Sequence, residues 1–293
     1  MKLSRRAFAL GLASVAACRT TRAPEEGDAQ ASRTATRVVS LGPATTEALF
    51  AIGAGGITVG RSRFCDTPPE ARALPSVGGF TDPSIETILS LRPDLVVGIR
   101  GPGGAAIVGT LEARGVRTYF PETESKDQIV SLLRGLGERT GRAKEAAALV
   151  SGIEAELAAV RNVVAKKPKR RALLVYGRAP LVVAGRGSFA DEMLTLAGIE
   201  NACASNEHYP TIDVERVLAW DPDDVLDASV GMGMDADDPS YFRTAGWRRV
   251  RAVTTGRVLK VTTMDVTRPG PSFARGVSAL ARLVHGPDGL SPG

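Results

Sequence analysis

The longest regular hydrophobic pattern lies near the middle of the chain, in residues 142–167. Its apolar positions step by three or four residues, which places them in one stripe along a helix of about 3.6 residues per turn. These positions are Ala146, Val150, Ile153, Leu157, Val160 and Val164. Gly141 precedes the stretch and Pro168 ends it, because proline cannot continue a helix. At about 1.5 Å per residue the predicted helix is roughly 36 Å long, which suits a rigid rod between two lobes.

A repeated pattern flanks this predicted helix. Residues 85–97 and residues 214–226 carry Glu, an apolar pair, Pro and Asp in the same order, with matching residues 129 positions apart. Each copy is typical of a short helix, a Pro-Asp turn and a strand. Such internal similarity indicates two related α/β halves, although units of this kind are common enough to recur by chance.

The rest of the chain alternates short apolar runs with amphipathic segments. In the first half we expect strands at 37–41, 57–60, 94–99 and 116–120, with helices at 45–52, 84–91, 105–114 and 126–139. In the second half we expect strands at 171–176, 181–184, 224–228 and 258–261, with helices at 189–197, 214–219 and 271–285. This alternation predicts mainly parallel sheets covered by helices on both faces. The predicted lobes are 37–140 and 169–293, joined by a helix within 141–168.

The first residues of the chain have the pattern of an export signal. A basic start is followed by an apolar run and small residues, so we interpret residues 1–17 as a signal peptide. Cys18 directly after them resembles a bacterial lipobox, which predicts lipidation of this residue; the alternative is an ordinary signal peptide with an incidental Cys. Residues 4–8, Ser-Arg-Arg-Ala-Phe, also resemble a twin-arginine signal.

Residues 18–36 have no hydrophobic period and predict a flexible tether. Together with a lipidated Cys18, this tether predicts a body on the periplasmic or cell-surface side that is anchored to a membrane.

The net charge bears on whether the protein binds nucleic acid, and the cysteines bear on whether the lobes are joined by a disulfide. The formal net charge is +5, and residues 1–17 supply three basic residues and no acid, which leaves +2 for the remainder. Since no basic run is interleaved with aromatic residues, we expect no nucleic-acid partner. Cys65 and Cys203 lie in different predicted lobes, where they are two separate thiols or, less favoured, a disulfide that ties the lobes together.

Motifs for catalysis and for metal binding are missing from the sequence. It contains no Gly-x-Ser-x-Gly elbow, no Walker loop and no Gly-x-Gly-x-x-Gly after a predicted strand. His208 and His285 are the two histidines of the chain, too few for a comfortable transition-metal site. We therefore predict no catalytic residue, no bound metal and no cofactor.

Ring-bearing and polar residues gather in loops near the ends of predicted strands. In the first half these are Pro43, Ala44, Phe64, Asp66, Phe80 and Arg100, and in the second half Tyr176, Tyr209, Asp265 and Arg268. Open α/β sheets bind ligands at the carboxyl ends of their strands, so these residues are candidates for an interlobe ligand cleft. Core packing is the alternative for each single aromatic residue.

Several of these segments resemble one known family. Residues 37–47, 65–71 and 85–97, with 246–253 and 268–271 in the second half, are similar to the substrate-binding proteins of cobalamin, haem and siderophore ABC importers. The vitamin B12-binding branch is the most similar one. The resemblance implies an α/β fold of two Rossmann-like lobes joined by one long helix, the class III arrangement with a helical backbone and little hinge motion. It also implies a monomeric, non-enzymatic receptor whose partners are a permease with its ATPase subunits and a small-molecule ligand.

The resemblance assigns a role to the repeat. Members of this family dock on the permease through one surface Glu per lobe, each of which meets Arg residues of a transmembrane subunit. The matching positions here are Glu86 and Glu215, which fall near predicted helix starts where the helix dipole favours an anion. Helix capping without a partner is the alternative.

The ligand stays open between three classes. Phe64, Phe80 and Tyr209 keep an apolar face for a flat macrocycle where the B12-binding members carry aromatic residues, whereas Ile99 departs from that pattern. A corrinoid is the primary expectation. Haem or a ferric siderophore is the alternative, since Tyr176, Tyr209 and His208 offer axial ligands and Arg100 and Arg268 can meet carboxylates or phosphates. A lipoprotein enzyme or signalling domain that reuses the fold is a third hypothesis.

Overall fold

The computed structural model describes residues 33–79, 81–100, 104–229 and 240–290. The predicted signal peptide, Cys18 and most of the tether lie outside these residues, as does Phe80. The folded unit begins at Thr34, slightly before the predicted strand, because the Ala35 N–H donates to the carbonyl of Arg139 and the Thr36 N–H donates to Asp94. In the part of the chain that is described, no helix is long and apolar enough to cross a membrane.

The N-terminal lobe (34–140) is built on a parallel sheet in the order β2-β1-β3-β4. Its strands are β1 (Val38–Ser40), β2 (Thr58–Arg61), β3 (Leu95–Val97) and β4 (Arg117–Tyr119). Its α-helices are α2 (Pro43–Ala51), α3 (Ile85–Ser90), α4 (Gly104–Glu112) and α5 (Lys126–Thr140), and two short 3-10 helices are η1 (Gly55–Ile57) and η2 (Pro69–Ala73). The predicted alternation of strands and helices in this half is therefore confirmed, with boundaries that move by at most two residues.

The C-terminal lobe (169–290) has a mixed sheet around its long strand β5 (Arg170–Arg178). The other strands are β6 (Leu181–Val183), β7 (Ile199–Asn201), β8 (Asp224–Asp227) and β9 (Val258–Lys260). Its helices are α7 (Phe189–Leu196), α8 (Val214–Trp220), α9 (Arg251–Thr254) and α10 (Phe273–His285), with 3-10 helices η4 (Tyr241–Arg243), η5 (Trp247–Arg249) and η6 (Met264–Thr267). β6 is antiparallel to β5, whereas β7 and β8 are parallel to it. Neither β7 nor α9 was expected from the hydrophobic pattern.

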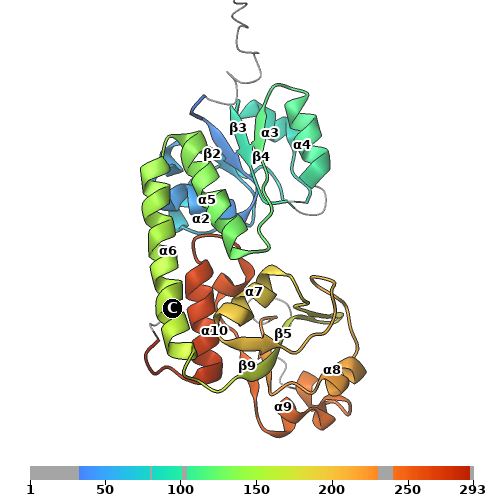
Figure 1. Ribbon diagram of the computed structural model, residues 1–293. Coiled ribbons are helices and arrows are strands. Elements are labelled where there is room, and N and C mark those ends of the chain that lie inside the picture. The colour runs from blue at the N-terminus through green and yellow to red at the C-terminus, as the bar shows by residue number, and fades with distance from the viewer. Residues whose placement is uncertain (1–32, 80, 101–103, 230–239, 291–293) are drawn as a thin grey trace, which may run out of the picture. The chain divides into compact units, whose positions relative to one another are not determined.

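The predicted connecting helix is present as α6 (Ala143–Val164). Its six predicted apolar positions are all buried, and it packs against α5 of the N-terminal lobe and against α7 and α10 of the C-terminal lobe (Figure 1). Gly141, at φ 68°, lets the chain leave α5 and turn back into α6. The rod that joins two lobes is therefore confirmed.

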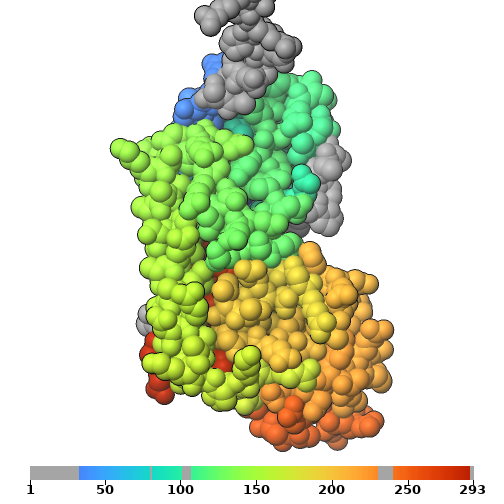
Figure 2. Space-filling model, viewed as in Figure 1, coloured from blue at the N-terminus to red at the C-terminus, as the bar shows by residue number. Residues whose placement is uncertain are grey.

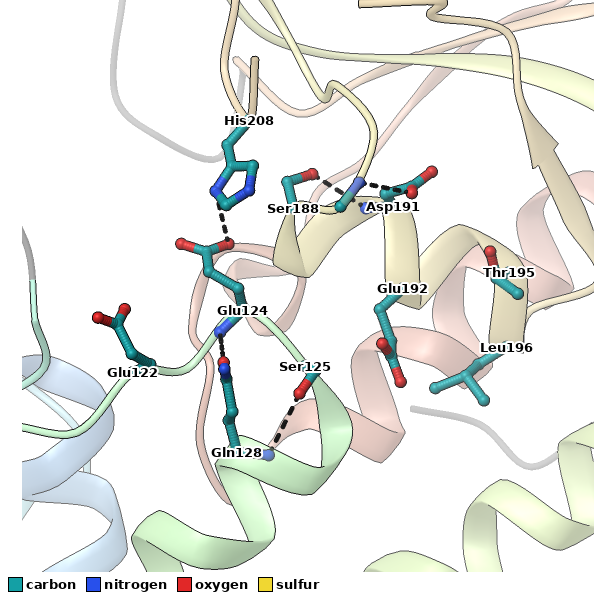
Figure 3. Close-up of a pocket in the computed structure, with 11 residues that line it drawn as sticks. Glu122, Glu124, Ser125, Gln128, Ser188, Asp191, Glu192, Thr195, Leu196 and His208 are labelled. Carbon is teal, nitrogen blue, oxygen red and sulfur yellow. Dashed lines mark hydrogen bonds and ion pairs between the residues drawn. The ribbon is translucent and has the colours of Figure 1, made fainter. Parts of the chain in front are cut away.

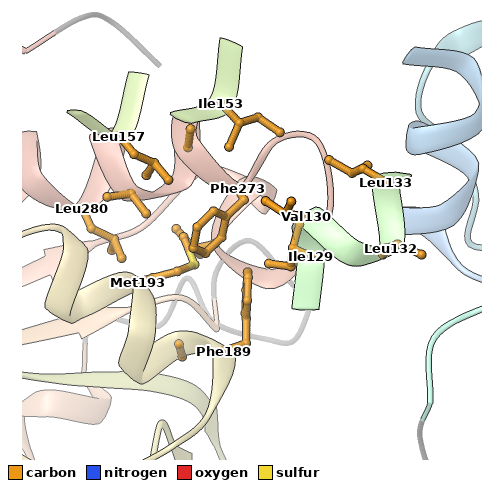
Figure 4. Close-up of a cluster of buried hydrophobic side chains, with 14 of the residues drawn as sticks. Ile129, Val130, Leu132, Leu133, Ile153, Leu157, Phe189, Met193, Phe273 and Leu280 are labelled. Carbon is orange, nitrogen blue, oxygen red and sulfur yellow. The ribbon is translucent and has the colours of Figure 1, made fainter. Parts of the chain in front are cut away.

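Both lobes share one apolar core along α6. The cluster takes Ile129 and Val130 from α5, and it continues into the second lobe through Phe189 of α7 and Phe273 of α10. The rings of Phe189 and Phe273 lie 5.5 Å apart between centroids. Figure 4 shows Phe273 near the centre of this cluster, with Val130 on one side and Met193 on another. The lobes are therefore joined by buried apolar surface as well as by the chain.

The two copies of the repeat have the same local geometry. α3 begins after Ser84 and α8 after Asp213, and in each case the side chain of that residue accepts a backbone N–H of the first turn. Each copy then turns through a residue in the left-handed region, Arg92 at φ 47° and Asp221 at φ 45°. These are the two non-glycine residues with positive φ in the described ranges.

One aspartate in each copy of the repeat accepts a backbone N–H at the start of the neighbouring strand. Asp94 accepts the backbone N–H of Arg37 at 3.2 Å, and Asp223 accepts that of Arg171 at 2.8 Å. Each aspartate thereby fixes the start of the strand next to its own, β1 in one lobe and β5 in the other. The prediction of two related halves is confirmed by these matched contacts.

The two cysteines of the folded unit are separate. Cys65 and Cys203 are both buried and both free, so the less favoured alternative of a disulfide between the lobes is wrong. The Cys65 sulfur instead lies 3.2 Å from the hydroxyl of Ser62.

A truncation in the shared core tests its contribution. We expect Phe273→Ala to lower the free energy of unfolding by about 3–5 kcal/mol, because it removes a fully buried ring and leaves a cavity. Urea unfolding followed by circular dichroism measures this loss. Phe64→Ala removes a half-exposed ring and serves as the control, with an expected change within about 0.5 kcal/mol. Equal effects of the two substitutions would contradict the shared core.

Candidate functional site

Loops that follow the parallel strands of the N-terminal lobe contact the C-terminal lobe. After β1, Ala44 packs so closely against Gly270 that a Cβ on Gly270 would lie 3.2 Å from atoms of Ala44. Ala44 is buried and Pro43 is half-buried in the first turn of α2. These two predicted ligand residues therefore lie at the lobe boundary, where Pro43 keeps some exposed surface.

The loop after β2 makes a second contact between the lobes. The Arg268 guanidinium donates to the Asp66 carboxylate at 3.1 Å and to the Thr67 hydroxyl at 2.9 Å. Arg268 is largely buried by this contact, whereas Asp66 remains half-exposed. Two of the predicted ligand residues are thus brought together from opposite lobes, and each already has a partner.

A buried carboxylate makes a third contact. Glu47 of α2 accepts from the Ser272 hydroxyl at 3.3 Å and from the Arg275 guanidinium at 3.5 Å. Arg275 also pairs with Asp265 at 3.3 Å, so this predicted ligand residue points into an ion-pair cluster. Burial raises the pKa of Glu47 above its ordinary value near 4.5, and the positive charge of Arg275 opposes that shift. Glu156 of α6, whose pKa is also raised by burial, adds a further carboxyl near Arg275.

The loop between β4 and α5 makes the fourth contact through Glu124. Its Oε2 accepts the backbone N–H of Phe189 at 2.8 Å and the Tyr209 hydroxyl at 3.4 Å, and it lies 3.8 Å from Nδ1 of His208. Figure 3 shows the Glu124 carboxylate directed at His208, beside the start of α7. No sequence signal marks Glu124 as a site residue, because these partners lie 65 to 85 positions away.

A cavity of about 480 Å³ lies beside Glu124, between the two lobes. Its walls come from the β4–α5 loop, the start of α5, α7 and the segment before Tyr209. The lining residues are Glu122, Glu124, Ser125, Gln128, Gly187, Ser188, Asp191, Glu192, Thr195, Leu196 and His208. Four of these are carboxylates, and no Lys or Arg is among them. In Figure 2 the green surface of the N-terminal lobe meets the yellow surface of the C-terminal lobe along this seam.

Two exposed rings flank the same boundary. Phe64 is 50% exposed and Tyr209 is 43% exposed, and they are the large apolar side chains that stand out to solvent among the described residues. Phe64 lies two positions before Asp66, which contacts the other lobe, and Tyr209 contacts Glu124 itself. Tyr209 therefore lies at the lobe boundary, and Phe64 lies in a loop that contacts the other lobe.

Tyr176 has a supporting position. Its side chain is buried, its hydroxyl donates to the Val266 carbonyl at 3.0 Å, and its ring meets Tyr209 edge-on with centroids 5.8 Å apart. Tyr176 therefore packs against Tyr209 and supports its position, but it has almost no exposed surface with which to contact a ligand. Arg100 is exposed and pairs with Glu122 at 3.3 Å, which places it near the cavity.

The two predicted docking residues are exposed and equivalent. Glu86 and Glu215 are the second residues of α3 and α8, and neither has a salt-bridge partner among the described residues. Across the same residues, no group of His, Cys, Asp and Glu side chains is arranged to hold a metal ion.

Comparison with known proteins defines the class. The model of the family described as periplasmic binding protein matches residues 38–263, so the chain belongs to that family. A vitamin B12-binding protein of Salmonella paratyphi A is 35% identical over 193 residues, which cover 66% of this chain and 72% of that protein.

Solved structures agree with this class. A periplasmic vitamin B12 binding protein of Vibrio cholerae shares the fold at a TM-score of 0.76, with 24% identity and coverage of 85% of this chain and 96% of that one. A periplasmic heme binding protein of Pseudomonas aeruginosa has a TM-score of 0.75 and 29% identity over 86% of this chain and 93% of that one. The protein is therefore an exported substrate-binding protein of the ABC importer type, with two α/β lobes, and it is not an enzyme.

The buried Glu47 makes stability depend on pH in a defined direction. Its raised pKa means that the folded state favours the protonated carboxyl, so its contribution is fully present below the ordinary value and is lost as pH rises through the folded-state pKa. Glu47→Gln cannot ionise. We therefore expect the free energy of unfolding of the variant, relative to wild type, to increase from about pH 4 to about pH 8. Urea unfolding across this range measures the difference, and a decrease with pH would show that pairing with Arg275 outweighs burial.

Proposed function

We propose that this protein captures a corrinoid between its lobes and delivers it to the permease of an ABC importer. The proposal rests on two exposed aromatic rings, Tyr209 at the lobe boundary and Phe64 in the loop that contacts the C-terminal lobe through Asp66. A flat macrocycle has two broad apolar faces, which exposed aromatic rings cover well. The 35% identity to a vitamin B12-binding protein supports the same ligand class.

The charges at the boundary favour a ligand whose rim carries no carboxylates. Arg100 pairs with Glu122, and Arg268 pairs with Asp66 and Thr67, so both predicted ligand-binding cations already have partners. A ligand that carries carboxylates would have to break these pairs to gain a counter-charge. A corrinoid has a rim of neutral amides. These amides can form hydrogen bonds with the paired Arg and carboxylate side chains without breaking the ion pairs.

Haem is the second candidate, because Tyr209 and His208 are exposed neighbours at the boundary and a solved heme-binding relative shares the fold. Axial ligation of ferric iron by tyrosine uses the phenolate form. Burial and then the nearby Glu124 carboxylate raise the pKa of Tyr209 above its ordinary value of 10.0. The hydroxyl also donates to Glu124, which keeps the phenol protonated. These features favour a corrinoid over haem.

Two equivalent glutamates, Glu86 and Glu215, would dock the protein on the permease to which it delivers the ligand. Glu86 and Glu215 are exposed on equivalent helix starts, one in each lobe. Charge-assisted hydrogen bonds to Arg residues of a permease would fix both the register and the orientation of the complex. Because α6 and the shared core hold the lobes together, the spacing between these two carboxylates is set by the fold.

The start of the chain would supply the membrane attachment. We propose that residues 1–17 are removed on export, that Cys18 is lipidated, and that the segment up to Thr34 tethers the body to the membrane. Separation of membrane and soluble fractions from cells that express the full chain tests the anchor. Cys18→Ser should move the protein to the soluble fraction, and unchanged membrane association would contradict lipidation.

Titration with purified protein tests the ligand. We expect cyanocobalamin and dicyanocobinamide to bind with dissociation constants in the micromolar range or tighter, and Phe64→Ala or Tyr209→Ala to weaken binding by about tenfold, since a lost aromatic contact is worth about 1.4 kcal/mol. Calorimetry and absorbance measure both. Absence of corrinoid binding at micromolar concentrations, together with tight haemin binding, would replace the corrinoid proposal with the haem one.

Uptake in cells tests delivery. Glu86→Ala combined with Glu215→Ala should abolish most ligand uptake while the dissociation constant of the purified protein stays unchanged, because both residues are exposed and neither lines the cavity. Glu138→Ala with Glu200→Ala is the matched control, with one exposed Glu removed from each lobe. Equal uptake by the docking variant and the control would exclude these carboxylates from docking.

A further inference from the structure

The two carboxylate oxygens of Glu124 differ in their hydrogen bonds. Its Oε2 accepts from the Phe189 N–H and the Tyr209 hydroxyl. Oε1 makes no hydrogen bond within the described ranges, and the side chain is 33% exposed. The carboxylate is thus held in place across the lobe boundary, and Oε1 can still accept a hydrogen bond beside the cavity that Glu124 lines.

The surroundings of Glu124 leave its charge largely uncompensated. His208, at 3.8 Å, is positive only when it is protonated. Glu122, Asp191 and Glu192 line the same cavity and no Lys or Arg does. Two cations beside this wall already have carboxylate partners, Arg100 with Glu122 and Lys126 with Asp127. A second anion that enters here would be repelled at short range, where water screens charges poorly.

We propose that Glu124 makes the cleft select macrocycles with neutral amides on their rim over macrocycles with carboxylates on their rim. The inference rests on the proposed corrinoid function and names the residue that sets the preference. An amide N–H on the rim of a corrinoid donates to Oε1. The propionates of haem offer no donor at neutral pH, and each carries a negative charge.

The contact to Tyr209 couples this preference to the apolar face of the site. Glu124 accepts from the Tyr209 hydroxyl and so fixes one end of the ring, while the Tyr176 ring packs against it at an interplanar angle of 67°. Tyr209 stays 43% exposed, so part of its ring is open to a ligand. Glu124 therefore acts as a positioning residue for Tyr209 and as a direct contact for the ligand rim.

The test compares the selectivity of charge-neutral variants. In Glu124→Gln the side-chain carbonyl can still accept the Phe189 N–H, so the variant removes charge and keeps size. We measure dissociation constants for dicyanocobinamide and haemin by titration of the full chain. The ratio of the haemin constant to the cobinamide constant should fall by about tenfold, with tighter haemin binding and slightly weaker cobinamide binding. Glu138→Gln, an exposed carboxylate further along α5, is the control and should leave the ratio unchanged.

A second variant separates a specific role from general charge. Glu192→Gln also neutralises a carboxylate of the cavity, but this residue makes no hydrogen bond across the lobe boundary among those described. It should shift the ratio by less than about threefold. Equal shifts for Glu124→Gln and Glu192→Gln, or an unchanged ratio for both, would overturn the role of Glu124 while leaving corrinoid binding intact. If the wild-type protein binds no corrinoid, the proposed function fails first, and the two failures are distinguishable.

Discussion

The arrangement of this molecule depends on one continuous apolar core that crosses from one lobe to the other along α6. Buried side chains of α5, α7 and α10 meet on the same stripe of α6, so the largest core cluster belongs to both lobes, while each lobe also has a smaller core of its own. Separating the lobes would expose rings such as Phe189 and Phe273 to water, which costs several kcal/mol. The hydrophobic effect therefore holds the lobes at a nearly fixed spacing, and the site is built on that spacing.

Polar contacts then set orientation, which apolar burial cannot do because it has no direction. Glu47, Asp66 and Glu124 of the N-terminal lobe each accept hydrogen bonds from the C-terminal lobe. Three separate segments, helix α2 and two loops, are fixed in this way, so the lobes resist rotation as well as separation. The rings of Phe64 and Tyr209 lie within two positions of these contacts, or make them. Rigid positioning of exposed rings lowers the entropic cost of binding a flat ligand.

The sequence could predict features with a period or a repeat. The spacing of apolar residues located α6, and the paired motifs located α3 and α8 with their exposed glutamates. It could not predict the contact of Glu47 with Arg275 or that of Glu124 with Tyr209, because a polar contact between residues 228 or 85 positions apart leaves no local pattern. Strand β7 was missed for a related reason: three residues become a strand through pairing with β5. Tyr176 was assigned to the cleft, but the fold buries it behind Tyr209.

A distance between the lobes, measured with and without ligand, tests the preformed cleft most directly. Spin labels at Glu112 and Arg249, both exposed and in different lobes, can be placed in the chain with Cys18→Ser, since Cys65 and Cys203 are buried. The shared core predicts one narrow distance distribution that moves by less than about 2 Å when cyanocobalamin is added. A broad distribution in the free protein, or a shift of many ångströms on binding, would contradict a fixed lobe spacing.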